Sequence, residues 1–170
     1  MFRIVPAPNG FLCPDDPGEP GRDKPRWSVN AVEARIVSEL CRGLRVLEIG
    51  TGLGVATREI ARRARMVYTV DVDPWVQKTV APTLPPNVIF FDDIQKVEVG
   101  DLDAAFIDGL HTLEQCSQDI RDARGIVKED GLFIFHDANM KSVFTAVHES
   151  NLESVYIKTS AGMALAWNGG

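Results

Sequence analysis

The segment VLEIGTGLGVAT, residues 46–57, constrains the fold of this chain more than any other part of its sequence. An apolar run leads into three closely spaced glycines, Gly50, Gly52 and Gly54, and a helical pattern starts directly behind them. Glycine suits a turn that needs positive φ or a close approach to the backbone, and the first turn of a helix leaves N–H groups free. The segment therefore predicts a strand, a tight turn and a helix that can hold a nucleotide-like ligand.

The same alternation of strands and helices continues along the chain. Seven apolar runs predict strands at 44–50, 66–72, 87–91, 102–108, 131–137, 154–158 and 162–167, and helical patterns lie at 28–43, 55–64, 74–80, 113–127 and 139–150. Apolar strands separated by helices are typical of a parallel sheet that is covered on both faces. Only TSAG separates the last two runs, which is too short for a crossover, so these strands should pair antiparallel.

We therefore expect an α/β fold of the Rossmann-like, three-layer kind, with a mostly parallel seven-stranded sheet and an antiparallel last strand. Asn30 followed by Glu33 has the form of a capping box, and Gly43 marks the end of the first helix. Only DDIQKVEVGD joins the third and fourth strands, so the crossover helix between them should be rudimentary.

Composition limits the class of protein. Residues 1–26 hold six of the ten prolines and show no period, so they predict an irregular arm in front of one domain, residues 27–170. No apolar run approaches the roughly 18 residues that span a bilayer, and the N-terminus lacks a secretory h-region, so we expect a cytoplasmic protein without a membrane span. The three cysteines, Cys13, Cys41 and Cys116, show no CxxC pairing, which argues against disulfides and zinc.

Charge and spacing indicate which ligand the glycine segment suits. The glycines fall as GxGxG, not as the dinucleotide fingerprint GxGxxG, and they follow an acid, Glu48. A carboxylate at this place suits a cationic ligand better than a pyrophosphate. Asp71 ends the second strand, where an acid can bind ribose hydroxyls, and Asp92 and Asp93 end the third, where they can accept from an amine. A cofactor with a ribose, an amine-bearing base and a positive charge fits all three places.

Four motifs, VLEIGTGLGVAT, VYTVDVDP, FIDGLHTLEQCSQDI and GLFIFHDA, together resemble the class I S-adenosylmethionine-dependent methyltransferases. The resemblance is greatest to the small-molecule O-methyltransferase-like group that includes relatives of macrocin and catechol O-methyltransferase, and it runs from about residue 28 to residue 167. It implies S-adenosylmethionine as the cofactor. The residues that it implies for cofactor binding are Glu48, Gly50, Thr51, Gly52, Gly54, Asp71, Val72, Asp93, Ile94 and Asp108.

The resemblance also implies a catalytic site at the ends of the fourth and fifth strands. In metal-dependent relatives an acid binds a divalent metal, a base three residues later deprotonates the acceptor hydroxyl, and a second acid completes the metal ligands. These positions match Asp108, His111 and Asp137. Ala138 stands where relatives carry an amide ligand, and His136 precedes Asp137. Two carboxylates and water suit Mg²⁺, whereas an inward-facing His136 would favour Mn²⁺, Fe²⁺ or Zn²⁺.

Other interpretations of these residues stay open at this point. Asp108 can form a turn with Gly109, His111 can begin the next helix, and His136 can be a satisfied core histidine. A chain that binds the cofactor without methyl transfer, as an assembly module, is the main functional alternative. We expect a small hydroxylated acceptor, because the net charge of −6 disfavours nucleic acid. The acceptor site would be closed by residues 1–26, closed by a second copy of the chain in a homo-oligomer, or left open.

Overall fold

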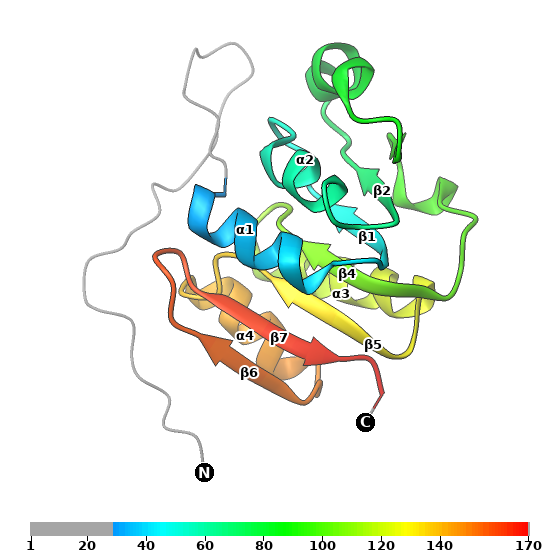
Figure 1. Cartoon of the computed structure of the whole chain (residues 1–170). Coiled ribbons are helices and arrows are strands. Elements are labelled where there is room, and N and C mark those ends of the chain that lie inside the picture. The colour runs from blue at the N-terminus through cyan, green and yellow to red at the C-terminus, as the bar shows by residue number, and fades with distance from the viewer. Residues whose placement is uncertain (1–28, 170) are drawn as a thin grey trace.

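The sheet of the computed structural model, which describes residues 29–169, has seven strands in the order β3-β2-β1-β4-β5-β7-β6 (Figure 1). The strands are β1 Arg45–Ile49, β2 Met66–Val70, β3 Val88–Phe91, β4 Leu102–Ile107, β5 Val127–Phe135, β6 Ser154–Ile157 and β7 Met163–Trp167. The first five pair in parallel, and β7 is antiparallel to both β5 and β6. The predicted fold class, with its antiparallel last strand, is confirmed.

Helices cover both faces of this sheet (Figure 1). Two of them, α1 Ala31–Leu40 and α2 Val55–Ala61, share an apolar core with one face, and α3 Leu113–Ile126 and α4 Lys141–Glu149 share a larger core with the other. The crossover from β3 to β4 holds only a 3₁₀ turn, Ile94–Lys96, as the short link predicts. No helix within residues 29–169 is long and apolar enough to cross a bilayer.

Asn30 caps the start of α1, as predicted, but its reciprocal contact with Glu33 runs through its side chain and not through its backbone N–H. The Asn30 side chain accepts hydrogen bonds from the backbone N–H groups of Val32 and Glu33, at 3.0 Å each, and donates to the Glu33 carboxylate. Gly43 adopts a left-handed φ of 75° after the helix ends. The predicted arm, residues 1–26, together with Cys13, lies outside the described residues, whereas Cys41 and Cys116 are buried free thiols.

The sequence prediction was wrong about the ends of the fifth strand. A strand was expected over 131–137, but β5 runs from Val127 to Phe135 and stops before His136. Asp137 has a left-handed φ of 52°, and its carbonyl accepts from the backbone N–H of Met140, 2.8 Å away. The chain therefore turns at Asp137 before α4 starts, and the alternation of side chains between faces no longer holds for His136 and Asp137.

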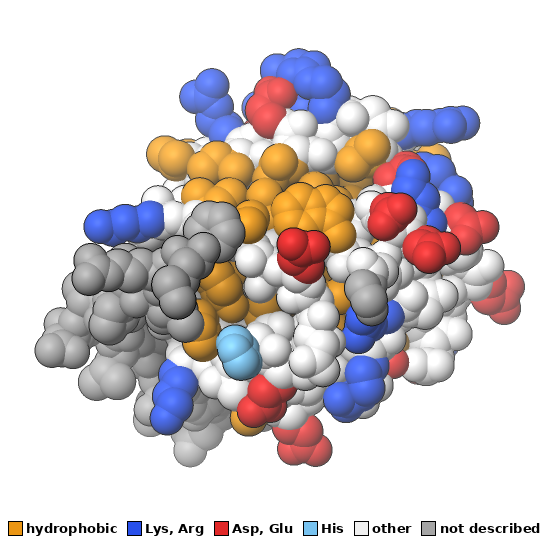
Figure 2. Space-filling model, turned by 90° about the horizontal axis from the view of Figure 1, so that it is seen from below, with side chains coloured by type: hydrophobic (Ala, Val, Ile, Leu, Met, Phe, Trp, Pro, Cys, Tyr) orange, Lys and Arg blue, Asp and Glu red, His pale blue; other side chains and the backbone are white. Residues whose placement is uncertain are grey.

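Parallel pairing brings the carboxyl ends of five strands to one edge. Ile49 of β1 is in register with Val70 of β2 and with Ile107 of β4, which in turn pairs with Phe135 of β5. The residues that follow these strands therefore meet at this edge, where ligands bind in open α/β sheets. The view from below in Figure 2 shows hydrophobic side chains grouped near the centre of that face, with Lys, Arg, Asp and Glu around them.

Candidate active site

The glycine turn, Gly50–Gly54, is held in place by close backbone contacts. Gly50 has a φ of 97°, and a Cβ atom built on it would lie 2.1 Å from the carbonyl oxygen of Asp108. Only glycine fits here, because both the φ and the approach of the loop after β4 exclude a side chain. At Gly52, with a φ of 50°, a Cβ would meet nothing within 4 Å. The turn therefore packs against the Asp108 loop on one side and faces open space at Gly52.

Two side chains fix the turn from opposite sides. Asp71, directly after β2, accepts hydrogen bonds from the backbone N–H groups of Gly52 (2.8 Å) and Asp73 (2.9 Å). The Arg58 guanidinium, on α2, donates to the carbonyl oxygens of Leu53 and Gly54, both at 2.9 Å. The predicted ribose acid thus contacts the turn that the sequence predicted as the cofactor loop.

Glu48 lies behind the turn in a neutral hydrogen-bond network. It is fully buried, its Oε2 accepts from the Thr69 hydroxyl at 2.6 Å, and the hydroxyls of Thr69 and Thr51 are also 2.6 Å apart. Burial raises the pKa of Glu48 to about 8, and the charges of Asp108 and Asp71 add to this effect. The carboxyl is therefore mostly protonated at pH 7. The sequence argument that Glu48 offers a negative charge to a cationic ligand does not hold for this environment.

The residues after β3 separate into two roles. Asp92 forms an exposed ion pair with Lys96, with 2.7 Å between Oδ1 and Nζ. Asp93 caps the following 3₁₀ turn by accepting from the backbone N–H of Gln95 at 2.9 Å. Val72, which was predicted to lie against a base, is 75% exposed beside Asp71. The exposure of Val72 leaves room for a planar group on this side of the edge.

Charged side chains gather at the ends of β4 and β5. Ligand atoms of Asp108, His111 and Asp137 lie within 4.8 Å of one another, a spacing that one metal ion can bridge. The Nε2 atom of His111 is 3.1 Å from Asp137 Oδ2 and 3.4 Å from Asp108 Oδ1. Burial acts to lower the pKa of His111, but the hydrogen bond with Asp108 and the charge of Asp137 outweigh it and raise this pKa.

His136 lies behind these carboxylates. Its Nδ1 atom is 3.1 Å from Asp108 Oδ1 and 3.2 Å from Asp137 Oδ2, and its Nε2 atom is 3.0 Å from Glu33 Oε2. Burial opposes the charged form, but Asp108 and Asp137 raise the pKa of His136 to about 11. With both ring nitrogens turned toward carboxylates, His136 acts as a donor to them. It is His111, not His136, that joins the two aspartates in the group that can hold a metal ion.

Glu33 is the member of this site that the sequence analysis missed. It is 1% exposed on the first turn of α1, and its Oε1 accepts from the backbone N–H of Ala161 (2.9 Å) and the Ser160 hydroxyl (3.2 Å). Its position three residues after Asn30 is explained by the cap of α1 alone, so no local feature of the sequence predicts that Glu33 belongs to the site. We refer to Glu33, Asp108, His111, His136 and Asp137 as the acid–histidine cluster.

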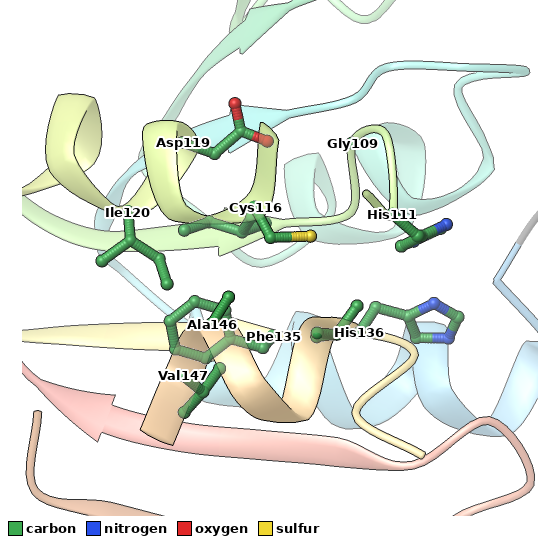
Figure 3. Close-up of a pocket in the computed structure, with 11 residues that line it drawn as sticks. Gly109, His111, Cys116, Asp119, Ile120, Phe135, His136, Ala146 and Val147 are labelled. Atoms are coloured by element: carbon green, nitrogen blue, oxygen red, sulfur yellow. The ribbon is translucent and has the colours of Figure 1, made fainter. Parts of the chain in front are cut away.

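A small cavity lies beneath the cluster, between α3 and α4. Its volume of about 10 Å³ is enough for one water at most, so it is not a cofactor pocket. Figure 3 shows the side chains of His111 and His136 together at one end of it and Cys116 and Asp119 along its wall. A ligand of the size that the glycine turn suits does not fit in this cavity.

Comparison with known proteins identifies the family. A family model described as "Methyltransferase domain" matches residues 47–138, which is more than half of the chain. The chain belongs to this methyltransferase family. The matched part contains the glycine turn and every member of the acid–histidine cluster except Glu33. The resemblance to S-adenosylmethionine-dependent methyltransferases that the motifs indicate is thereby confirmed.

Solved structures share the fold of this methyltransferase. Cofactor-bound Rv0187 from MTB superposes with a TM-score of 0.73 at 20% identity, over 87% of this chain and 85% of that one. The O-methyltransferase TomG from Streptomyces achromogenes, involved in tomaymycin synthesis and solved with SAM, has a TM-score of 0.69 at 16% identity, over 84% and 82%. At these identities the likeness concerns the fold.

Curated relatives match the methyltransferase over a shorter stretch. The ribosomal RNA small subunit methyltransferase A of Leuconostoc citreum is 39% identical over 70 residues, which cover 39% of this chain and 24% of that protein. The four curated relatives are matched over at most 30% of their own length. These matches support the methyltransferase assignment but do not identify the acceptor of this chain.

The methyltransferase brings most of its sequence-predicted site residues to one edge. The glycine turn, Asp71 and the members of the cluster other than Glu33 follow strands β1, β2, β4 and β5, which are adjacent in the sheet. Asp93 follows the outermost of the parallel strands, β3, so it lies at the far end of that edge. The glycine turn therefore lies next to the cluster, and Asp93 lies toward the other end of the same edge.

Proposed function

We propose that this methyltransferase transfers the methyl group of S-adenosylmethionine to a hydroxyl oxygen of a small acceptor. The observation that supports the proposal is the contact between the glycine turn and the Asp108 loop, because a sulfonium held on this turn would lie beside Asp108, His111 and Asp137. In the reaction a C–O bond forms as the S–CH₃ bond breaks, the hydroxyl proton passes to His111, and S-adenosylhomocysteine leaves. The enzyme's task is to hold oxygen, methyl carbon and sulfur in line.

We assign the cofactor to the sheet edge, as the sequence motifs imply. Its methionine part would lie on Gly50, Thr51, Gly52 and Gly54, where Gly52 faces open space, with Glu48 behind them. Its ribose would bind Asp71. Its adenine would lie between Val72 and Ile94 with its amine at Asp93, and Asp108 would border the reacting end.

The donor set of the cluster fits a divalent cation. Asp108 and Asp137 would hold Mg²⁺ or Mn²⁺ with water, which leaves His111, beside them in the same group, for the proton transfer. When bound, such an ion lowers the pKa of a coordinated hydroxyl and so makes it a better nucleophile. Asp108 suits this role because the two histidines keep its pKa low in spite of its burial.

His111 is the group that we assign as general base. Its side chain is 27% exposed, whereas that of His136 is 6% exposed, so His111 is the more accessible of the two histidines. Its raised pKa depends on the negative charges of Asp108 and Asp137. Where those charges are neutralised, the pKa of His111 moves back toward neutrality, which is the range that suits proton transfer at physiological pH.

The test is a calorimetric titration of S-adenosylhomocysteine into metal-stripped protein, followed by methyl transfer from labelled S-adenosylmethionine. The acceptor panel contains catechols, other phenols, sugar alcohols and, as a separate arm, ribosomal RNA. Micromolar binding with transfer to a hydroxylated small molecule is the expected result. Binding without transfer to any arm would favour the non-catalytic module, and transfer to RNA alone would replace the acceptor class.

A further inference from the structure

Glu33 connects three parts of the chain that are distant in sequence. Its Oε2 contacts His136 Nε2 at 3.0 Å across 103 residues, and its Oε1 accepts from Ala161 and Ser160 in the loop between β6 and β7. A carboxylate that is 1% exposed is costly to bury unless its oxygens are paired. Both oxygens of Glu33 have partners here, and one of these partners is His136, which contacts both Asp108 and Asp137.

We propose that Glu33 is a positioning residue that acts through His136, whose ring holds the carboxylates of Asp108 and Asp137 in place for a divalent cation. The inference rests on the cation site of the proposed function. It adds a residue that lies outside the region matched by the family model, residues 47–138.

The His136 ring has a carboxylate at each of its nitrogens. Nδ1 lies 3.1 Å from Asp108 Oδ1 and 3.2 Å from Asp137 Oδ2, and Nε2 lies 3.0 Å from Glu33 Oε2. The side chain of His136 is 6% exposed, so these contacts fix the ring from both of its edges. Without Glu33, the ring would be held only through the two aspartates.

Glu33 therefore orients the ligands of the proposed ion through His136. The contacts of Nδ1 hold Asp108 Oδ1 and Asp137 Oδ2 beside the same edge of the ring, and both aspartates belong to the group that can hold one ion. Groups that hydrogen-bond to metal ligands commonly alter metal affinity by 10–100-fold when they are changed.

Glu33 also tethers α1, so the experiment must separate its contact with His136 from this tether. The variant Glu33→Gln keeps the size of the side chain, but one of the two accepting oxygens becomes an NH₂ group, so one side of the contact network loses its acceptor. Glu39→Gln is the matched control on the same helix, because Glu39 is exposed and pairs with Arg42 and Arg63 at the surface. Ser160→Ala removes one Oε1 partner and leaves the His136 side intact.

The measurement is the Kd of Mn²⁺ for the full chain, from the free-ion signal in electron paramagnetic resonance, together with the Kd of S-adenosylhomocysteine without metal. We expect Glu33→Gln to raise the Mn²⁺ Kd about tenfold or more and to change the S-adenosylhomocysteine Kd less than twofold. Glu39→Gln and Ser160→Ala should leave both constants unchanged. If Glu33→Gln does not fold, Glu33→Asp, which draws the carboxylate back from His136, should raise the Mn²⁺ Kd.

The outcomes separate this inference from the proposed function. Wild-type affinity for Mn²⁺ in a folded Glu33→Gln or Glu33→Asp chain overturns the role of Glu33 and leaves the methyl transfer proposal intact. A wild-type chain that binds S-adenosylhomocysteine but no Mn²⁺ also overturns it, while the cofactor assignment stands. Loss of both affinities in Glu33→Gln would make Glu33 a tether only. A wild-type chain that binds neither ligand contradicts both proposals.

Discussion

The two halves of the ligand-binding edge are built in different ways. The half formed by β1 and β2 consists of left-handed glycines, backbone hydrogen bonds and a carboxyl, Glu48, that is mostly protonated at pH 7. The half formed by β4 and β5 concentrates three carboxylates and two histidines within hydrogen-bond distance of one another. A neutral, closely packed backbone suits the recognition of a cofactor's shape, whereas clustered charges suit the movement of a proton and the binding of an ion.

The two halves are in close contact at the glycine turn. Gly50 belongs to this turn, and a Cβ atom on it would lie 2.1 Å from the carbonyl oxygen of Asp108. The backbone N–H of Asp108 also donates to the carbonyl of Ile49 at 2.9 Å. A change at this contact should therefore affect both halves, whereas a change to a side chain away from it should affect one half more than the other.

The largest effect should follow from Gly50→Ala, which disrupts that contact. The added Cβ would lie 2.1 Å from the Asp108 carbonyl oxygen at a φ of 97°, so the loop must move or the strand must distort. We expect a loss of more than about 3 kcal/mol in the free energy of unfolding, measured by urea denaturation. Gly43→Ala is the matched control, since Gly43 has a φ of 75° and open space around it, and it should cost about 1–2 kcal/mol. Equal losses in the two variants would show that the close approach is unimportant.

Next in size is the effect of His111→Ala on turnover. Removal of a general base lowers kcat by about 10²–10⁴-fold, and His111 has no role in the cofactor half, so the Kd of S-adenosylhomocysteine should not change. Turnover of an accepted substrate and calorimetry measure the two quantities. His148→Ala, at an exposed position of α4, is the control and should retain full activity. Wild-type turnover in His111→Ala would show that His111 is not the general base, and the proposed role of the cluster would be limited to binding an ion.

The protonated Glu48 predicts a dependence of stability on pH. Between its ordinary value of 4.5 and about 8, the folded chain holds a proton that the unfolded chain has released, so this group makes the protein less stable as pH rises through that window. Glu48→Gln removes the effect. The stability of this variant relative to wild type should therefore increase from pH 4.5 to pH 8, by about 3–5 kcal/mol in unfolding free energy. A difference that does not vary with pH would mean that Glu48 is ionised in the folded protein.

These cases also explain how much of the molecule could be predicted from the sequence. The glycine turn and the strand pattern depend on local requirements, so they are visible in residues 46–57 and in the apolar runs. The protonation of Glu48 depends on burial by the whole sheet, and the role of Glu33 depends on a partner 103 residues away. The end of β5 at Phe135 was missed because the apolar pattern continues to the point where Asp137 turns the chain.

The smallest effect concerns Arg58, whose side chain is attached to the glycine turn by hydrogen bonds. Its guanidinium donates to the carbonyls of Leu53 and Gly54 at 2.9 Å and to the Thr83 hydroxyl at 2.6 Å. Arg58→Ala should loosen the turn and raise the Kd of S-adenosylhomocysteine about three- to tenfold, measured by calorimetry. The control is Arg62→Ala on the same helix, because Arg62 is exposed and pairs only with Glu59 among the described residues.

Arg58→Ala should affect the affinity for S-adenosylhomocysteine but not the affinity for Mn²⁺. The hydrogen bonds of Arg58 run to Leu53, Gly54 and Thr83 and to no member of the acid–histidine cluster, so Arg58→Ala should leave the Mn²⁺ Kd unchanged, the opposite of what is expected for Glu33→Gln. Two variants that each alter one ligand's affinity would mean that the halves are energetically separate except at Gly50. If Arg58→Ala weakened the binding of S-adenosylhomocysteine and of Mn²⁺ equally, the two halves would be coupled along the whole edge. The assignment of cofactor binding to one half and ion binding to the other would then be wrong.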